Sequence, residues 1–283
     1  MTSRDRPTGR PPAPDPLPIP VVDNHCHLDI RRDDAALVDL TQVVGEAAAV
    51  GVDRLVQIGC DLRSARWTVS VLDDHPALLG GVAIHPNEAP GHEAAGDLDE
   101  AIDEIAALAR HPRVRTIGET GLDYYRTGPE GVDAQHHSFR RHIALAKELG
   151  LALQVHDRDA HEDILRILAE EGAPDRTVLH CFSGDLEMAR ECVRRGYYLS
   201  FAGTVTFRSA ASLRDALSVT PPEHLLVETD APYLTPTPHR GRVNAPYLIP
   251  HTVRAMAQIR GSSVHELCQA LSANSEAVYG SWA

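Results

Sequence analysis

The stretch VVDNHCHLD, residues 21–29, places two histidines in a short apolar run that predicts a buried β-strand. Side chains alternate faces along a strand, so His25 and His27 point to the same side. Two adjacent imidazoles pack poorly in an apolar core, but they are good metal ligands. One core histidine beside one surface histidine would fit the motif equally well, so the rest of the chain has to decide.

Seven further apolar runs follow, and they alternate with amphipathic stretches. The eight runs cover residues 19–26, 53–60, 78–85, 113–120, 151–157, 176–182, 197–203 and 224–230. Apolar residues three and four apart predict helices at 98–110, 135–150, 161–172 and 185–196, with terminal helices at 246–261 and 263–280. This alternation predicts a single α/β domain over residues 21–283, a (β/α)8 TIM barrel. An open doubly wound sheet would normally have a glycine-rich loop after its first strand, and none is present.

The first twenty residues carry seven prolines and no apolar stretch. A secretory signal needs roughly 7–15 consecutive apolar residues, so residues 1–20 instead predict a disordered, extended leader. No run approaches the ~20 apolar residues of a membrane span. The five cysteines, at 26, 60, 181, 192 and 268, are odd in number and lack C-x-x-C spacing. They predict reduced thiols in a cytoplasmic protein, with structural roles for Cys26 and Cys181.

The formal charge of −13 argues against a protein that coats duplex nucleic acid through a broad basic surface. It does not exclude a narrow site, because bound divalent ions would supply local positive charge.

Ionisable residues recur where the predicted strands end. After His25 and His27, these residues are His85, Glu119, His156, His180 and Asp230. The carboxyl ends of barrel strands share one rim, where barrel enzymes build their sites. We therefore expect residues more than 200 positions apart to meet there and bind metal.

Four imidazoles and two carboxylates suit Zn²⁺, Mn²⁺ or Co²⁺, whereas Mg²⁺ favours a larger share of oxygen. Two ions fit if Glu119 bridges them, with His25, His27 and Asp230 on one ion and His156 and His180 on the other. Two ions about 3.5–4 Å apart can activate water and stabilise the attacking and leaving oxygens. No nucleophile signature indicates covalent catalysis.

These residues lie in motifs that carry a family resemblance. The motifs are DNHCHLD (23–29), AIHP (83–86), GETGLDYY (118–125), VHDRDA (155–160), HCFSG (180–184) and ETDAPYL (228–234). Over about residues 21–280, the chain resembles the TatD family of metal-dependent hydrolases, a branch of the amidohydrolase-like barrels. The resemblance implies two divalent ions (Mg²⁺, Mn²⁺ or Zn²⁺) and a deoxyribonuclease that degrades single-stranded DNA from the 3′ end. It implies the same ligand sets, with Asp230 as the base that orients or deprotonates the attacking water.

Other residues near these motifs are candidates for substrate contacts. Arg158, Arg208, His239 and Arg240 could bind phosphates, and a solvated surface charge is the alternative for each arginine. Phe182, Tyr124 and Tyr125 could stack on unpaired bases, although core packing is the expected role of at least one tyrosine. His85 is expected to orient a ligand or the substrate.

Two other functions stay open from the sequence. The same ligands could serve an ester or amide hydrolase, such as a D-aminoacyl-tRNA deacylase, because water would be activated identically. A non-catalytic binding barrel is disfavoured by the complete ligand set. No membrane contact and no obligate protein partner is indicated, and the sequence leaves the metal and the oligomeric state open.

Overall fold

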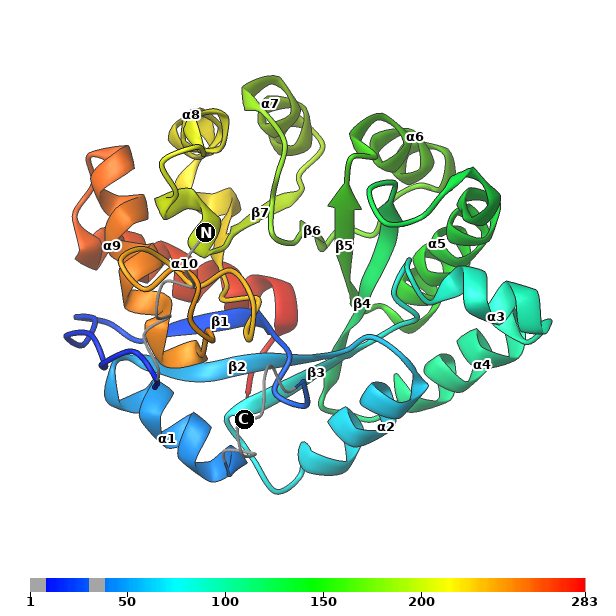
Figure 1. The fold of residues 1–283 in the computed structure, drawn as a ribbon, viewed down its shortest axis with the longest axis horizontal. Helices are drawn as coiled ribbons and strands as arrows, with labels where there is room; N and C mark the ends of the chain where they lie inside the picture. Colours follow the sequence, from blue (N-terminus) through cyan, green and yellow to red (C-terminus); the bar gives the residue numbers. More distant parts are fainter. Residues whose placement is uncertain (1–8, 31–38, 283) are drawn as a thin grey trace, which may run out of the picture.

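Eight parallel strands form one sheet in the order β1 to β8 (Figure 1). The computed structural model describes residues 9–30 and 39–282. The strands are Val21–Cys26 (β1), Val52–Gly59 (β2), Leu78–Val82 (β3), Val114–Asp123 (β4), Ala152–Arg158 (β5), Thr177–Leu179 (β6), Tyr198–Phe201 (β7) and Leu225–Val227 (β8). The predicted (β/α)8 TIM barrel is confirmed, with each predicted strand close to its expected place.

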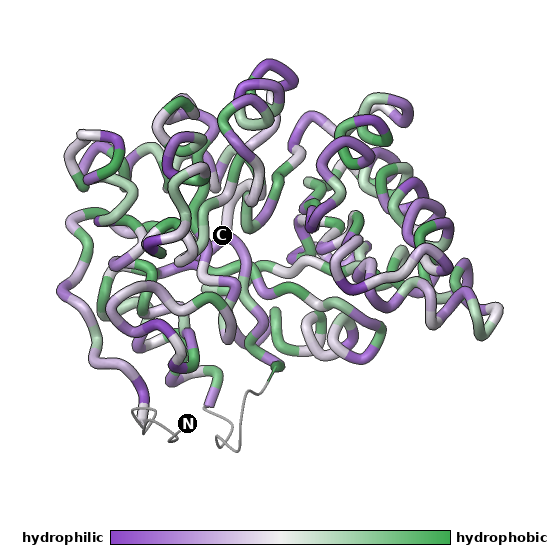
Figure 2. The backbone as a smooth tube through the Cα atoms, turned by 45° about the horizontal axis from the view of Figure 1, so that its top comes forward, coloured by the Kyte–Doolittle hydropathy of each residue, from purple (hydrophilic) through white to green (hydrophobic). Residues whose placement is uncertain are grey.

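Most of the helices lie around the outside of the sheet, in approximately chain order (Figure 1). The helices are Leu40–Ala49 (α1), Leu62–Val71 (α2), Ala89–Ala95 (α3), Leu98–Leu108 (α4), Val132–Leu149 (α5), His161–Glu171 (α6), Leu186–Arg194 (α7), Ala211–Val219 (α8), Ile249–Arg260 (α9) and Val264–Tyr279 (α10). Hydrophilic and hydrophobic residues alternate around these outer helices (Figure 2). This periodicity lets each helix cover the sheet with one apolar stripe. None of the helices within residues 9–30 and 39–282 is both long and apolar enough to cross a membrane.

Successive strand residues serve two separate apolar cores. In β2, Leu55 belongs to the large cluster between sheet and helices, whereas Val56 and Ile58 belong to a smaller cluster inside the barrel. The end of the chain closes that inner cluster with Tyr279 and Trp282. The inner core thus occupies one end of the barrel, and the other end is left for polar side chains.

The barrel closes where the segment after β8 meets the end of β1. An isolated bridge pairs Cys26 with Ala231. The Asp230 N–H donates to the His25 carbonyl at 3.0 Å, and the His27 N–H donates to the Ala231 carbonyl at 2.8 Å. The first and last of the predicted ligands are therefore brought together by the backbone itself.

The expectation of disorder through residues 1–20 is wrong for the later part of this segment. Leu17 is 7% exposed, and its N–H donates to the Val50 carbonyl at 3.0 Å. The Tyr247 hydroxyl donates to the Pro11 carbonyl at 2.7 Å. An extended, proline-rich chain has few N–H groups to satisfy, so a few contacts from distant parts of the sequence suffice to hold it. Residues 1–8 lie outside the described residues.

Candidate metal centre

All six predicted ligands meet at the carboxyl ends of the strands, and the Glu119 carboxylate lies between two groups of them. Its Oε1 is 3.5 Å from His25 Nε2 and 3.4 Å from His27 Nε2. Its Oε2 is 2.9 Å from His156 Nδ1 and 2.8 Å from His180 Nε2. One oxygen of the same side chain thus faces each group.

The first group is built around two imidazoles whose Nε2 atoms face each other at 3.3 Å. His25 Nδ1 lies 2.5 Å from Gln154 Oε1, and His27 Nδ1 lies 3.1 Å from the Ile58 carbonyl. Both partners only accept hydrogen bonds, so each Nδ1 carries a proton and each Nε2 offers a lone pair. Two facing lone pairs repel unless a proton or a cation lies between them. Asp230 Oδ1 is 3.3 Å from His27 Nε2 and 3.9 Å from His25 Nε2.

Asp230 reaches this position through an unusual backbone conformation. Its φ is +53°, in the left-handed region that non-glycine residues seldom adopt. The hydrogen bond from its N–H to the His25 carbonyl and the one from the Tyr233 N–H to its carbonyl, at 2.8 Å, hold the turn in place. Such residues cluster at functional sites, because the surrounding structure must over-determine them.

In the second group, a carboxylate lies behind each histidine. His156 Nε2 lies 3.2 Å from Asp123 Oδ2, and His180 Nδ1 lies 3.4 Å from Glu228 Oε1. Glu228 is fully buried, and its other oxygen accepts the Ser200 hydroxyl at 2.5 Å. A carboxylate behind a ligating histidine fixes the orientation of the ring and strengthens it as a ligand.

The electrostatics of the centre favour positive charge among the ligands. Burial opposes ionisation of Glu119, but His180 and His85 hold its pKa well below the ordinary value. Burial opposes protonation of His180, but Glu119 and Glu228 raise its pKa well above the usual range. The pKa of His27 is raised in the same sense, against burial, by Cys60 and Asp230. Divalent ions would replace these protons, because ligating imidazoles must be neutral.

The donor spacing fits metal coordination. Donors that share an ion at about 2.0–2.2 Å lie roughly 3–3.6 Å apart, close to most of the separations given above. Within residues 9–30 and 39–282, four overlapping sets could hold an ion. They are His25–His27–Asp230, His25–Glu119–His180, His27–Cys60–Glu119 and His85–Glu119–His156. Glu119 belongs to three of these four sets, so the cluster could hold metal at either side of its carboxylate.

Four contributors to the centre were not predicted from the sequence: Cys60, Asp123, Gln154 and Glu228. Cys60 ends the second predicted strand, so the rule that selected the histidines could have selected it too. Asp123 and Glu228 lie in quoted motifs, but their contacts depend on strands far away in the sequence. All five cysteines are free, and Cys60 and Cys181 are partly exposed.

His85, which was predicted to orient a ligand or the substrate, lies directly beside the predicted ligands Glu119 and His156. Its Nε2 is 3.5 Å from Glu119 Oε2, and its ring centroid is 4.6 Å from that of His156. Its Nδ1 accepts the Asn87 N–H at 3.0 Å, so the proton of the neutral ring sits on Nε2 and points to Glu119. Burial lowers the pKa of His85, which keeps the ring in this neutral form.

Of the predicted phosphate-binding arginines, Arg158 is the last residue of β5, and Arg208 and Arg240 lie in segments that follow later strands. The Arg158 guanidinium lies 3.9 Å from the Tyr125 ring centroid, and Tyr125 is 66% exposed. The Arg240 guanidinium stacks at 4.1 Å over Phe207. Arg208 is exposed directly after Phe207. His239 is partly buried, with its ring 5.2 Å from that of His251.

Two of the predicted base-stacking side chains are engaged elsewhere. Phe182 is 3% exposed, and its ring centroid lies 5.9 Å from that of Phe201. The prediction for Phe182 is therefore wrong, because this side chain, two residues after His180, turns into the core. The Tyr124 hydroxyl donates to Asp163 at 2.6 Å, and its ring packs against the outer core. Tyr125 alone of these three presents an open aromatic face.

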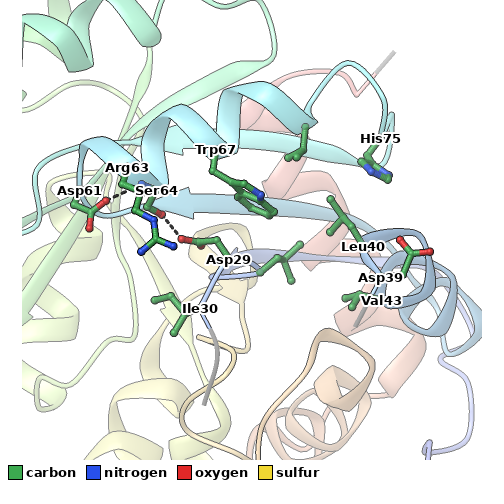
Figure 3. Close-up of a pocket in the computed structure, with 12 residues that line it drawn as sticks. Asp29, Ile30, Asp39, Leu40, Val43, Asp61, Arg63, Ser64, Trp67 and His75 are labelled. Atoms are coloured by element: carbon green, nitrogen blue, oxygen red, sulfur yellow. Dashed lines mark hydrogen bonds between the residues drawn. The ribbon is translucent and has the colours of Figure 1, made fainter. Parts of the chain in front are cut away.

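A separate pocket of about 810 Å³ lies between α1, α2 and the segment after β1 (Figure 3). Asp29, Trp67 and His75 are among its lining residues, and none of the six predicted ligands is. Two of its residues, Ile30 and Asp39, border residues 31–38, which lie outside the described part of the chain.

Known proteins match the chain along almost its whole length. A family model described as TatD related DNase matches residues 22–280. The uncharacterized metal-dependent hydrolase TatD of Mycobacterium tuberculosis is 44% identical over 266 residues, which cover 92% of this chain and 98% of that protein. The 3′-5′ ssDNA/RNA exonuclease TatD of Citrobacter rodentium is 36% identical over 251 residues, which cover 86% of this chain and 92% of that protein. The crystal structure of YjjV, a TatD homologue from Escherichia coli, superposes with a TM-score of 0.83 at 25% identity, covering 92% of this chain and 98% of that one.

Proposed function

The chain belongs to the TatD-related DNase family of metal-dependent hydrolases that act on ester bonds, and on that premise we propose that it removes nucleotides from the 3′ end of single-stranded DNA. The observation that carries the proposal is the position of Glu119, with one carboxylate oxygen toward each histidine group. This placement suits two ions at a distance from which both can act on one phosphodiester. The name of the Citrobacter relative supports a nucleic-acid end as the substrate.

His25, His27, Glu119 and Asp230 would hold one ion, and Glu119, His156 and His180 the other. When bound, the two ions would polarise the phosphate and lower the pKa of the attacking water. Asp230 is the residue suited to accept the proton of that water. Its side chain is 15% exposed, so it reaches the mouth of the barrel while staying 3.3 Å from His27 Nε2. A carboxylate within hydrogen-bond reach of the nucleophile is a competent general base.

The other buried groups keep the ligands in place during turnover. Gln154 holds the His25 ring through Nδ1, while Asp123 and Glu228 stand behind His156 and His180. His85 directs a proton toward Glu119 Oε2 and can stabilise negative charge on the phosphate beside it. Little rearrangement of these side chains is then needed when substrate arrives.

The terminal nucleotide would be held by the loops that follow the strands. The stacked Arg158–Tyr125 pair offers a cation and an open ring face together. Base stacking on an exposed aromatic ring contributes about 1–3 kcal/mol and is tolerant of sequence. Arg208 and Arg240 add positive charge beside Phe207 in a chain that is otherwise acidic. A narrow basic rim favours a strand end over a long duplex.

The test compares oligonucleotides labelled at either end, incubated with the purified protein and Mg²⁺ or Mn²⁺. We expect a 5′-labelled single strand to shorten stepwise and a 3′-labelled one to release labelled mononucleotide at once. Duplex DNA, RNA and aminoacyl-tRNA are tested in parallel. Asp230→Asn is the control and should reduce the rate by about 10²–10⁴-fold.

Two results would overturn the proposal. The first is the absence of hydrolysis of any nucleic acid with any divalent ion. The second is release of the amino acid from aminoacyl-tRNA while DNA ends stay intact, which would assign the same water activation to a deacylase.

A further inference from the structure

The Cys60 thiol lies among the imidazoles and carboxylates of the candidate metal centre. Cys60 follows β2, on the rim where the neighbouring strands present their ligands. Its Sγ lies 3.3 Å from Glu119 Oε1 and 3.6 Å from His27 Nδ1, the ring nitrogen that donates to the Ile58 carbonyl. The other nitrogen of that ring, Nε2, is the one with a free lone pair for an ion, and it lies 3.4 Å from Glu119 Oε1. That same Glu119 oxygen is the one that faces the first histidine group. Cys60, His27 and Glu119 offer one donor atom each, and all three atoms lie within 4.8 Å of one another.

The other cysteines do not share this position. Cys26, Cys192 and Cys268 are buried in the apolar cluster between sheet and helices. The Cys26 thiol donates to the Val56 carbonyl, away from the ligands. Cys181 directly follows His180, yet it belongs to none of the donor sets found in the described part of the chain. Among the five cysteines, Cys60 is therefore the one whose sulfur lies beside potential metal ligands.

We infer that Cys60 is a sulfur ligand for the ion held by His27 and Glu119, and that it makes this position selective for thiophilic cations such as Zn²⁺, Co²⁺ and Cd²⁺. The inference rests on the metal centre of the proposed function. An oxygen and a sulfur that share one ion at about 2.1 and 2.3 Å lie roughly 3.6 Å apart, close to the separation of Sγ and Oε1. Thiolate ligands select Zn²⁺ and other soft ions, whereas Mg²⁺ and Mn²⁺ prefer oxygen.

Cys60 also has a role in this arrangement when an oxygen-preferring ion such as Mg²⁺ is bound. Its S–H donates to Glu119 Oε1, so with Mg²⁺ the side chain would stay protonated and orient the shared carboxylate. With a soft ion the thiol would release its proton to solvent, and Cys60 would offer a thiolate sulfur as a ligand. Metal identity would then decide whether Cys60 acts as a ligand or as a hydrogen-bond donor.

The experiment uses the full chain, stripped of metal by a chelator and titrated with Co²⁺ or Cd²⁺ while the ultraviolet absorption is recorded. A thiolate bound to either ion gives a sulfur-to-metal charge-transfer band. We expect this band in the unaltered protein and in Cys181→Ser, and its loss in Cys60→Ser. Serine keeps a hydrogen-bond donor for Glu119 and replaces only the sulfur by oxygen. The variant therefore tests whether the sulfur atom itself binds the ion.

Affinities provide the second readout. Cys60→Ser should weaken Cd²⁺ and Zn²⁺ binding by at least about tenfold and leave Mn²⁺ binding within about twofold. Bound Co²⁺ without the band in the unaltered protein, or a band that survives in Cys60→Ser, would refute the role of Cys60 and leave the proposed function standing. Failure of the unaltered protein to bind any of these ions would instead refute the centre itself.

Discussion

Glu119 is the side chain on which both halves of the centre depend. It is 4% exposed, and its two carboxylate oxygens face different sets of histidines. The five histidines within 3.5 Å are His25 and His27 near Oε1, and His85, His156 and His180 near Oε2. Removing it would leave each histidine group without its shared anion. Removing a histidine from one group would leave the other group with its carboxylate.

Metal content can separate these two effects. Glu119→Ala should lose most of both ions, because neither group keeps a bridging oxygen. His180→Ala should lose about one ion per chain, because His25, His27 and Asp230 are untouched. Mass spectrometry of the two proteins, loaded with Mn²⁺ and desalted, gives the count. Equal losses in the two variants would contradict the bridging role of Glu119.

His142 is a buried residue that links the metal centre to the outer helices. It is fully buried on α5, its Nδ1 donates to the Ser138 carbonyl at 2.7 Å, and its Nε2 accepts the Ile84 N–H at 3.2 Å. Ile84 directly precedes His85, so this hydrogen bond helps to place the loop after β3. Burial lowers the pKa of His142 to about 4.

The sign of the resulting pH effect follows from proton binding. Below pH 6.5 the unfolded chain protonates this histidine before the folded chain does, so the stabilising contribution is complete above pH 6.5 and is lost as the pH falls toward 4. The lost contribution is on the order of 3 kcal/mol. Urea unfolding of the unaltered protein and of His142→Gln at several pH values measures it. We expect their difference in unfolding free energy to shrink between pH 6.5 and 4.5. A constant difference would mean that His142 does not titrate in this range.

At the scale of elements, β4 and β5 approach each other closely where the second histidine group is formed. Gly121 in β4 pairs with His156 in β5. Its φ is +141°, and a Cβ atom there would lie 2.1 Å from the His156 carbonyl oxygen. This position requires glycine, because any side chain would push β5 and its ligand away from Glu119.

Gly121→Ala should therefore affect both stability and metal content. We expect a loss of about 1–3 kcal/mol in unfolding free energy from overpacking, together with weaker binding of the ion near His156. Gly150→Ala is the matched control, since Gly150 also has a positive φ, +62°, but no atom lies within 4 Å of the position that a Cβ would take. Gly150→Ala should lower the unfolding free energy by about 1–2 kcal/mol and leave the metal content unchanged. Equal metal content in the two variants would argue against strand displacement.

The segment before β1 shows the same dependence of one element on distant ones. The Arg10 guanidinium lies 5.0 Å from the Tyr247 ring centroid and pairs with Glu46 on α1. Arg254 on α9 donates to the Asp15 carbonyl at 2.7 Å. These contacts tie the start of the barrel to its last helices, next to the seam between β1 and β8.

At the scale of the whole molecule, the ligands come from strands spread between His25 and Asp230. Only the folded chain brings them together, so bound metal must stabilise folding. At a free metal concentration of 100 times the dissociation constant, bound metal should add about 2.7 kcal/mol to the unfolding free energy. This corresponds to a rise in Tm of roughly 5–10 °C for a chain of this size. A chelator should abolish both hydrolysis and this rise, and added Mn²⁺ should restore both. Calorimetry of the unaltered protein and of Glu119→Ala provides the comparison, and an equal rise in the two would contradict binding at this centre.

Much of the architecture is determined by local patterns. The apolar runs at 53–60 and 78–85 predict strands because buried strands need continuous apolar side chains, and helix periodicity predicts the segments between them. Alternation with helices then requires parallel strands, whose carboxyl ends share a rim. That is why residues as far apart as His25 and Asp230 could be assigned to one centre from the sequence.

The tertiary structure alone decided which way individual side chains turn and what they meet. It placed Phe182 in the core, brought Asp123 and Glu228 behind the histidines of the second group, and packed Leu17 beside Val50. No local pattern carries this information, because each of these contacts joins segments that are distant in the chain. Periodicity specifies which face of an element is buried, whereas the partner on the other side is set by how the whole barrel closes.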